Sequence, residues 1–355
     1  MRSDRFRSLL TARGPFASVY IDDSHDTADA EAQIELRWRE IGQQLDDRVS
    51  ADVVAAIERS VLGGGPAVGR SGRSIIADAV GVVLDEPLLR GAAAPVVRVS
   101  EFPYIIPVIE HGLEHPSYLV VAVDHAGADI TVHCHGRTTT ERVDGGGYPV
   151  HKASGAETAG YGDPQPRAEE ARAKNIRATS DRVSALLDDT EAELVFVAGE
   201  VRSRSDFVAA VPARVGSRIV EVNVGARGSI DQDALAHEIA TTFQLRRART
   251  IEQAAQRFEA EIARGSGLAT EGMAGVCAAL RDGAAETLII GEVGDATVVV
   301  GEGFSTIAPN AEVLSEWGRP PSGVARADEA LPIVAVSVDA NLVRADERID
   351  PKEGV

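Results

Sequence analysis

The middle of the chain constrains the fold most, because it predicts a strand, a long connection, a helix and a second strand. The runs 118–123 (YLVVAV) and 194–198 are short, apolar and rich in β-branched residues, which is typical of strands. A helix is expected between them over 168–187. The connection before that helix, 145–167, is far longer than a normal link between two elements, and such loops are usually functional. The sequence therefore predicts a domain that projects a segment towards a partner.

Length and cysteine content limit the class of protein. A chain of 355 residues is long enough for two or three domains, each with its own core. No apolar run is long enough to span a bilayer, and the first ten residues do not resemble a signal peptide. Cys134 and Cys277 are the only cysteines and lie far apart, so no disulfide framework is expected. We therefore expect a cytoplasmic protein with no membrane partner.

The charge balance limits the kind of nucleic-acid contact. The net charge is −19, from 36 Lys and Arg residues against 55 Asp and Glu residues. So acidic a chain is not held on nucleic acid by its overall field, and we expect no DNA partner. Local basic contacts stay open, since arginine greatly outnumbers lysine and its planar guanidinium suits phosphate.

Residues 1–115 are predicted to form an N-terminal α/β domain. Its second helix ends at the glycines and proline of 63–66, a strong stop signal. The next residues have the spacing of a phosphate-binding loop, but Arg70 stands where lysine is required, a helix precedes and a strand follows. We interpret this stretch as an exposed loop that presents Arg70 and Arg73. Strands are expected at 16–21, 74–79, 81–84 and 96–99.

A long helix over 231–264 is predicted to connect the middle domain to a C-terminal one, and Ser229 with Gln232 has capping-box spacing at its start. The C-terminal part alternates helices with apolar runs, which indicates a small α/β sandwich. Its expected strands are 286–290, 297–300 and 333–338. The predicted fold is therefore α/β with three domains, 1–115, 116–230 and 231–355.

The order of these elements resembles the archaeal and eukaryotic class-1 release factor and Pelota group, and several separated motifs carry the likeness. They are most similar to the bacterial branch of that group, whose actinobacterial members are related to the ribosome hibernation factor Balon. The motifs are 14–20 (GPFASVY), 22–26 (DDSHD), 147–152 (GYPVHK), 197–204 (VAGEVRSR) and 276–290 (VCAALRDGAAETLII). The resemblance implies three α/β domains in the release factor and Pelota-like arrangement.

The same resemblance implies a function. The chain would be a ribosome hibernation factor that fills the ribosomal A site and needs no cofactor. Its N-terminal domain would lie at the decoding centre on 16S rRNA, and its loop would reach the peptidyl transferase centre on 23S rRNA. The C-terminal domain would lie beside elongation factor Tu. A mixed surface suited to a protein partner is expected there from Glu302, Glu312, Glu316, Trp317 and Arg319.

The chain departs from release factors at the catalytic motif, because it has no Gly-Gly-Gln tripeptide. The corresponding place holds Gly162-Asp163-Pro164-Gln165, whose spacing resembles that of hydrolytic relatives of the group. Proline lacks an N–H donor, and Asp163 would bring negative charge towards a developing oxyanion. We therefore expect no catalytic residue. The alternative is a ribosome-associated peptidyl-tRNA hydrolase that uses Gln165, and a third option is a stress protein that acts away from the ribosome.

Candidate rRNA-binding side chains are either flat groups that stack on unpaired bases or donors that contact phosphate. His133 and His135 share a face of a strand, but no cysteine or carboxylate cluster accompanies them at ligand spacing, so no metal site is expected. The candidates near the loop are Tyr148, His151, Lys152, Tyr161, Gln165, Arg167, Lys174 and Arg182, and those of the N-terminal domain are Arg70 and Arg73.

Overall fold

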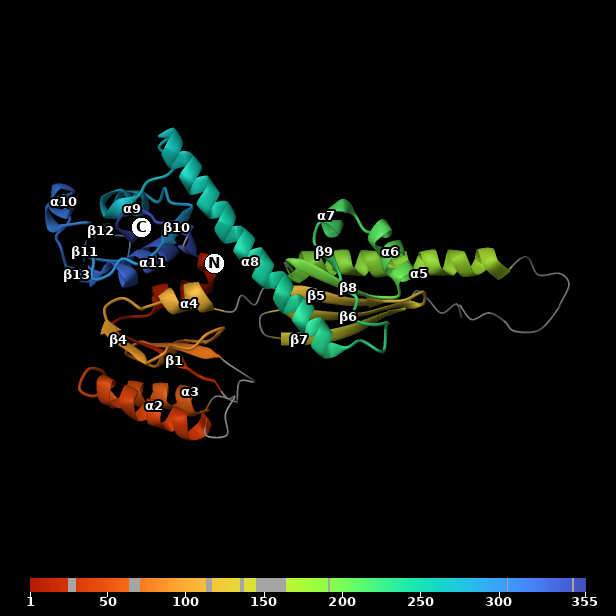
Figure 1. Ribbon diagram of the computed structural model, residues 1–355, viewed down its shortest axis with the longest axis horizontal. Helices are drawn as coiled ribbons and strands as arrows, with labels where there is room; N and C mark the ends of the chain where they lie inside the picture. The colour runs from red at the N-terminus through yellow and green to blue at the C-terminus, as the bar shows by residue number, and fades with distance from the viewer. Residues whose placement is uncertain are drawn as a thin grey trace. The chain divides into compact units, whose positions relative to one another are not determined.

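The computed structural model contains two compact units, which are described separately (Figure 1). The terminal unit comprises Met1–Leu113 and Ala248–Val355, and the central unit comprises Glu114–Arg247. Both are built from sheets and helices, so the predicted α/β class is confirmed. The structure describes residues 1–24, 30–63, 71–112, 117–134, 137–144, 164–190, 192–304, 306–346 and 348–355, without the side chains of 30–31 and 164–168.

The N-terminal part of the terminal unit is an antiparallel sheet in the order β3-β2-β1-β4. Two helices, α2 (Ala30–Leu45) and α3 (Ala51–Gly63), pack on one face, where Ile41 and Ile57 meet Val19 in an apolar cluster. The strands are β1 (Phe16–Asp22), β2 (Gly72–Ala77), β3 (Val82–Leu88) and β4 (Val96–Ser100). Short helices η1 (Ser3–Phe6), α1 (Arg7–Thr11) and α4 (Ile106–His111) complete this part.

The C-terminal part of the terminal unit has two small sheets, β10-β14 and β12-β11-β13. The expected strand at 333–338 is wrong, because residues 333–337 belong to α11 (Ala327–Ser337) and Val338 is the residue that follows it. That helix is buried on almost every side, so its sequence is a continuous apolar run that periodicity cannot distinguish from a buried strand. The other elements are α9 (Gly272–Arg281), β10 (Thr287–Ile290), β11 (Thr297–Val300), β12 (Ile307–Ala308), α10 (Ala311–Glu316), β13 (Gly323–Arg326), β14 (Asn341–Arg344) and η2 (Lys352–Gly354).

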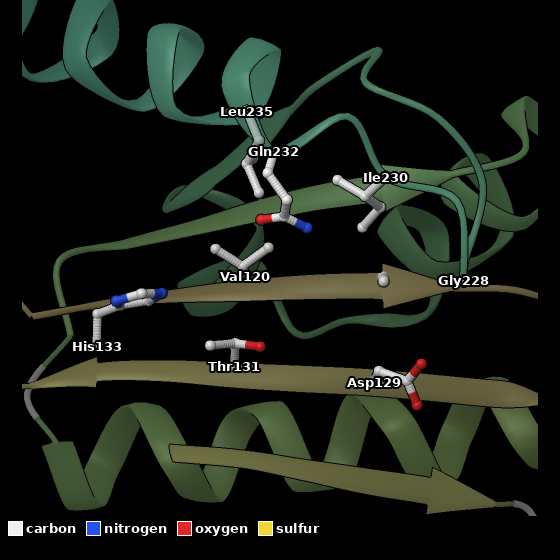
Figure 2. Close-up of a pocket in the computed structure, with 9 residues that line it drawn as sticks. Val120, Asp129, Thr131, His133, Gly228, Ile230, Gln232 and Leu235 are labelled. Atoms are coloured by element: carbon white, nitrogen blue, oxygen red, sulfur yellow. The ribbon is translucent and has the colours of Figure 1, made fainter. Parts of the chain in front are cut away.

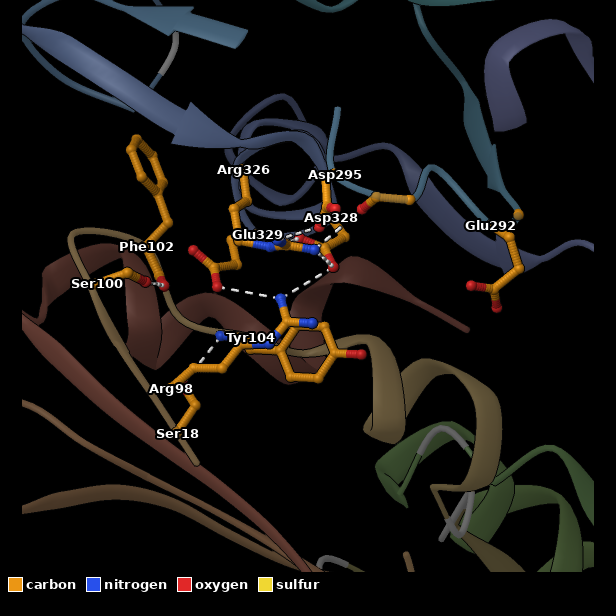
Figure 3. A network of polar contacts seen from close by, with 12 residues as sticks. Ser18, Arg98, Ser100, Phe102, Tyr104, Glu292, Asp295, Arg326, Asp328 and Glu329 are labelled. Carbon is orange, nitrogen blue, oxygen red and sulfur yellow. Dashed lines mark hydrogen bonds and ion pairs between the residues drawn. The ribbon is translucent and has the colours of Figure 1, made fainter. Parts of the chain in front are cut away.

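One apolar core joins these two sequence-distant parts of the terminal unit. Phe6 and Ile105 from the N-terminal part belong to the same buried cluster as Leu331 and Leu342. A polar network lies beside that core, between the β1–β4 side of the unit and α11 (Figure 3). The two segments that sequence alone assigns to different domains therefore bury their apolar surface against each other.

The polar network is centred on Arg98 of β4. Its Nη1 lies 2.9 Å from Asp328 Oδ2 and 3.1 Å from Glu329 Oε1 (Figure 3). The Arg98 guanidinium also lies over the Tyr104 ring, 3.7 Å from its centroid. The Glu329 side chain is only 3% exposed, so its charge depends on Arg98 for compensation. Arg326 extends the network by pairing with Asp328.

The central unit has a five-stranded sheet in the order β7-β6-β5-β8-β9. Strands β5 and β8 run parallel with Tyr118 opposite Leu194, which confirms the strand–helix–strand module predicted from the sequence. Helices α5 and α6 pack on one face, and the first half of α8 packs on the other. The elements are β5 (Tyr118–Val123), β6 (Gly127–Cys134), β7 (Arg137–Asp144), α5 (Pro164–Thr190), β8 (Leu194–Gly199), α6 (Val201–Ala210), α7 (Ala213–Gly216), β9 (Ile219–Glu221) and α8 (Gln232–Arg264).

Helix α5 begins at Pro164, four residues before the start predicted from the sequence. The first turn of a helix leaves its N–H groups without intrahelical partners, so a proline there loses no hydrogen bond. Pro164 and Pro166 therefore belong to the first turn, and Gln165 lies between them in the helix rather than in the preceding loop. The connection between β7 and α5 is accordingly 145–163.

Helix α8 is continuous to Arg264, as predicted, but its N-cap differs from the prediction. Asp231, not Ser229, caps the helix: its Oδ1 accepts a hydrogen bond from the Ala234 N–H at 3.0 Å. Aspartate and serine cap helices about equally well, so spacing alone did not separate them. None of the helices in the described ranges carries an apolar stretch that would cross a membrane.

The motif at 197–204 has a structural role in the central unit. Gly199 has φ +136°, and a Cβ there would lie 2.1 Å from the Val123 carbonyl oxygen, so only glycine allows β8 this close to β5. Arg204 is nearly buried and donates from Nη1 to the Val222 carbonyl at 2.7 Å. Gly199 and Arg204 therefore hold the sheet together.

Candidate functional site

The candidate site is the end of the central sheet from which residues 145–163 depart. Strand β7 ends there at Asp144, and α5 extends beyond the sheet at the same end (Figure 1). Asn175 marks where α5 meets the sheet: it is buried, and its Nδ2 donates to the His125 carbonyl in the β5–β6 turn at 3.0 Å. Residues 164–174 precede that contact, so the first turns of α5 extend beyond the fixed point.

Arg227, just before α8, holds this end of the sheet together. Its side chain is 7% exposed, and Nη1 lies 3.2 Å from Asp124 Oδ1 while Nη2 lies 2.6 Å from Asp129 Oδ1. Asp144 Oδ1, at the last residue of β7, is 3.8 Å from Nη2. The hydrogen bond from Arg227 holds the pKa of Asp129 below its usual range. We call Arg227 with Asp124, Asp129 and Asp144 the Arg227 hub.

The hub fixes the end of β7, where residues 145–163 begin. Asp124 Oδ1 also accepts from the N–H groups of Ala126 and Gly127 at 2.7 and 2.9 Å, which closes the β5–β6 turn. One guanidinium thus connects that turn, β6 and the end of β7. Sequence reasoning missed Arg227, because its partners are far away along the chain and no local pattern marks a lone arginine between glycines.

The described cations of α5 differ in how they are held. Lys174 and Arg177 are exposed, and neither forms an ion pair with any described residue. Arg182 is held by Glu141 of β7 through Nε–Oε1 and Nη2–Oε2 contacts of 2.5 and 2.7 Å. That hydrogen bond lowers the pKa of Glu141. Arg182 therefore clamps β7 to α5, whereas Lys174 points its charge to solvent.

The other predicted rRNA ligands are placed only in part. Arg70, Tyr148, His151, Lys152 and Tyr161 lie outside the described residues, and Gln165 and Arg167 are placed by their backbone alone. The expectation that Arg73 is exposed is wrong. It lies in β2 with its side chain 16% exposed, and it forms a bidentate pair with Asp85 at 2.6 and 2.9 Å. Its contact with rRNA stays a prediction.

A groove of about 320 Å³ lies on the sheet face covered by the start of α8 (Figure 2). Its floor is apolar, and polar side chains of β6 point into it. His133 stacks on Tyr118 with ring centroids 4.4 Å apart, and burial lowers the pKa of His133. The lining residues are Val120, Ala122, Asp129, Thr131, His133, Gly228, Ile230, Gln232 and Leu235. Across the described parts of the chain, no His, Cys, Asp and Glu side chains cluster as a metal would require.

In the terminal unit, the residues expected to meet a protein partner are exposed. Trp317 is 38% exposed, and the Arg281 guanidinium lies 3.6 Å from its ring centroid. Glu302, Glu312, Glu316 and Arg319 are also exposed. An exposed tryptophan held by an arginine is the kind of residue that dominates protein interfaces.

Comparison with known proteins relates the central part of the chain to a family. Residues 117–264 match the model of bacterial archaeo-eukaryotic release factor family 2, which covers the sheet of the central unit and α8. This release factor-like class agrees with the resemblance found in the sequence.

Two mycobacterial relatives match over the whole chain. The chain is 46% identical over 357 residues to uncharacterized protein Rv2629 of Mycobacterium tuberculosis strain H37Rv, covering 100% of this chain and 96% of that one. The same values hold for uncharacterized protein MT2704 of strain CDC 1551. The chain belongs to the family of these mycobacterial proteins, and its residues 117–264 match the release factor-like model.

Solved structures are similar only loosely. A ribosome-bound archaeal Pelota is 13% identical with a TM-score of 0.42, covering 97% of this chain and 88% of that one. The archaeal termination factor aRF1 is 15% identical with a TM-score of 0.24, covering 97% and 92%. No property of this chain follows from scores this low.

Proposed function

We propose that this protein is a ribosome hibernation factor that occupies the A site without catalysing a reaction. Two findings support it: residues 117–264 match a release factor-like family, and the Arg227 hub holds the end of β7, where residues 145–163 begin. The hub is the observation that carries the proposal, because a segment that probes a deep site needs a fixed base. In this proposal residues 145–163 approach 23S rRNA and the N-terminal part approaches 16S rRNA.

That the protein does not catalyse peptide release is proposed from the sequence of residues 145–163 and from the start of α5. The chain has no Gly-Gly-Gln, and Gln165 lies in the first turn of α5 between two prolines. A glutamine that activates water needs backbone N–H donors aimed at the developing oxyanion, and prolines supply none. The alternative, a peptidyl-tRNA hydrolase, relies on the G-x-x-Q spacing alone.

Phosphate contacts are proposed on the exposed side of α5. Lys174 and Arg177 project from the half of the helix nearer the loop, while Ile176 and Val183 are buried on the other side. Arg182 would have to leave Glu141 to meet phosphate, so its contribution is expected to be smaller than that of Lys174. Elongation factor Tu is the proposed partner of the surface around Trp317.

Co-sedimentation with vacant 70S ribosomes across a salt titration tests ribosome binding. Lys174→Glu should weaken binding and reduce its salt dependence, because each lost phosphate contact removes roughly 0.7–0.9 from the slope of log K against log salt. Arg202→Glu is the matched control, since Arg202 is an exposed cation on α6 of the same unit. Equal binding of Lys174→Glu and the wild type at every salt concentration would contradict the proposal.

A single-turnover assay with peptidyl-tRNA in the P site separates the two functions. The wild type and Gln165→Ala should both release no more peptide than ribosomes alone. Release by the wild type that disappears in Gln165→Ala would establish the hydrolase instead.

A further inference from the structure

The groove of the central unit is built for a cation rather than for phosphate. The guanidinium of Arg227, next to the lining residue Gly228, is buried and shared by Asp124, Asp129 and Asp144. Arg142 lies opposite Asp129 in the β6–β7 ladder and pairs with Asp144. These two cations face the three hub carboxylates, and Asp231 and Asp233 flank Gln232 in exposed positions at the start of α8. Among the described groups the local charge is therefore negative, which repels phosphate and attracts cations.

The interior of the groove combines an apolar floor with hydrogen-bond acceptors. Val120 and Ala122 form part of the floor, and Leu235 forms part of the helical wall. At one end Asp129 presents a carboxylate with its side chain 39% exposed. Gln232 projects its carboxamide over the groove from α8 (Figure 2). An occupant needs an aliphatic or flat body, to cover the floor, and N–H donors for the carboxylate.

His133 supplies a flat wall at the other end of the groove. Its ring is fixed by stacking on Tyr118 and by a 3.2 Å contact between Nδ1 and the Thr138 hydroxyl. Burial lowers the pKa of His133, which favours the uncharged ring that does not repel a cation. A guanidinium group donates to a carboxylate such as that of Asp129 through a planar fork, which an ammonium group does not.

We infer that this groove binds an arginine side chain from a basic segment of a partner protein. The aliphatic stem would lie on the floor between β5, β6 and α8, and the guanidinium would donate to Asp129. The volume, about 320 Å³, is at the lower limit of ordinary ligand pockets, which suits a single side chain better than a larger ligand. This inference does not depend on ribosome binding, because every residue that lines the groove belongs to the central unit and the proposed occupant is a protein segment.

Capped pentapeptides, Gly-Gly-Xaa-Gly-Gly, provide the test with the full-length ¹⁵N-labelled protein. With arginine at Xaa, NMR shifts should appear at Thr131, His133 and Gln232 and yield a dissociation constant of about 1 mM or weaker. Citrulline is the neutral isostere of arginine. With citrulline at Xaa, binding should weaken about fivefold, which corresponds to the loss of one exposed ion pair. Cytidine is included to represent an unpaired nucleobase.

Two matched variants test whether the arginine peptide binds in this groove. Gln232→Arg puts a cation over the groove at an exposed helical position and should weaken the arginine peptide about fivefold. Gln244→Arg makes the same change at an exposed position further along α8 and should leave binding unchanged. The absence of shifts with arginine, equal affinity for citrulline, equal weakening by both variants, or binding of cytidine in place of arginine would each overturn the inference.

Discussion

The two arginine-centred networks of this protein use the same chemistry for different purposes. In the terminal unit, Arg98 faces Asp328 and Glu329, whose side chains are 13% and 3% exposed, beside a large apolar core. In the central unit, Arg227 faces Asp124 and Asp129, which are 28% and 39% exposed. The Arg98 network joins distant chain segments into one core, whereas the Arg227 hub shapes a surface. Partner burial, rather than the ion pair itself, separates the network beside the core from the network at the surface.

Removing Arg98 should have the largest effect on stability. Arg98→Ala leaves the Glu329 carboxylate buried without its cation, which costs roughly 3–5 kcal/mol of the free energy of unfolding. Urea denaturation measures the loss. The double variant Arg98→Ala/Glu329→Gln should recover part of it, since the buried charge is gone. A loss below about 1 kcal/mol would show that Glu329 is rehydrated and would erase the difference between the two networks.

Removing Arg227 should affect stability less and function more. In Arg227→Ala the three carboxylates lose their cation but can be hydrated, so a loss of about 1–3 kcal/mol is expected in the same denaturation experiment. Ribosome co-sedimentation should fall even at temperatures where the variant is folded. Arg227→Lys, which keeps the charge but not the planar fork, should be intermediate. Normal ribosome binding by a folded Arg227→Ala variant would show that the Arg227 hub is not needed for ribosome binding.

The Arg182–Glu141 pair should contribute little to stability, because both side chains are well exposed. A double-mutant cycle with Arg182→Ala and Glu141→Ala should give a coupling of roughly 0.2–1 kcal/mol. The charge swap Arg182→Glu/Glu141→Arg decides the role of Arg182. If the swap restores the ribosome binding that Arg182→Glu alone loses, Arg182 acts as a clamp between α5 and β7. If binding is still lost in the swap, Arg182 contacts rRNA directly.

The smallest effect is expected from acid titration of the exposed pairs. The pKa values of Asp129 and Glu141 are lowered in the folded state, by hydrogen bonds from Arg227 and Arg182. Their contribution is therefore present above the unfolded pKa values, near 4, and is lost as the pH falls through the lower folded values. The melting temperatures of Arg227→Ala and the wild type should therefore become more similar as the pH falls through this range. A gap that widens on acidification would contradict the assignment.

Local pattern determined much of the fold from sequence. Strands β5 and β8 and the long helix α8 were predicted because their apolar periodicity and stop signals lie within short windows. The release factor-like resemblance was also visible in the sequence, since each of its motifs is an unbroken stretch of residues. The start of α5 was not, because a proline in a first turn and a proline in a loop look alike in sequence.

The remaining features were decided by contacts between residues far apart in the chain. The apolar run of α11 is a helix only because neighbours cover it on nearly every side, and sequence does not show what covers a segment. Arg227 became visible as a hub only when folding placed Asp124, Asp129 and Asp144 around it. Sequence by itself determined the main elements of the central unit, the release factor-like resemblance and the long connection. Tertiary structure decided which charges are buried, because burial depends on neighbours that no local window contains.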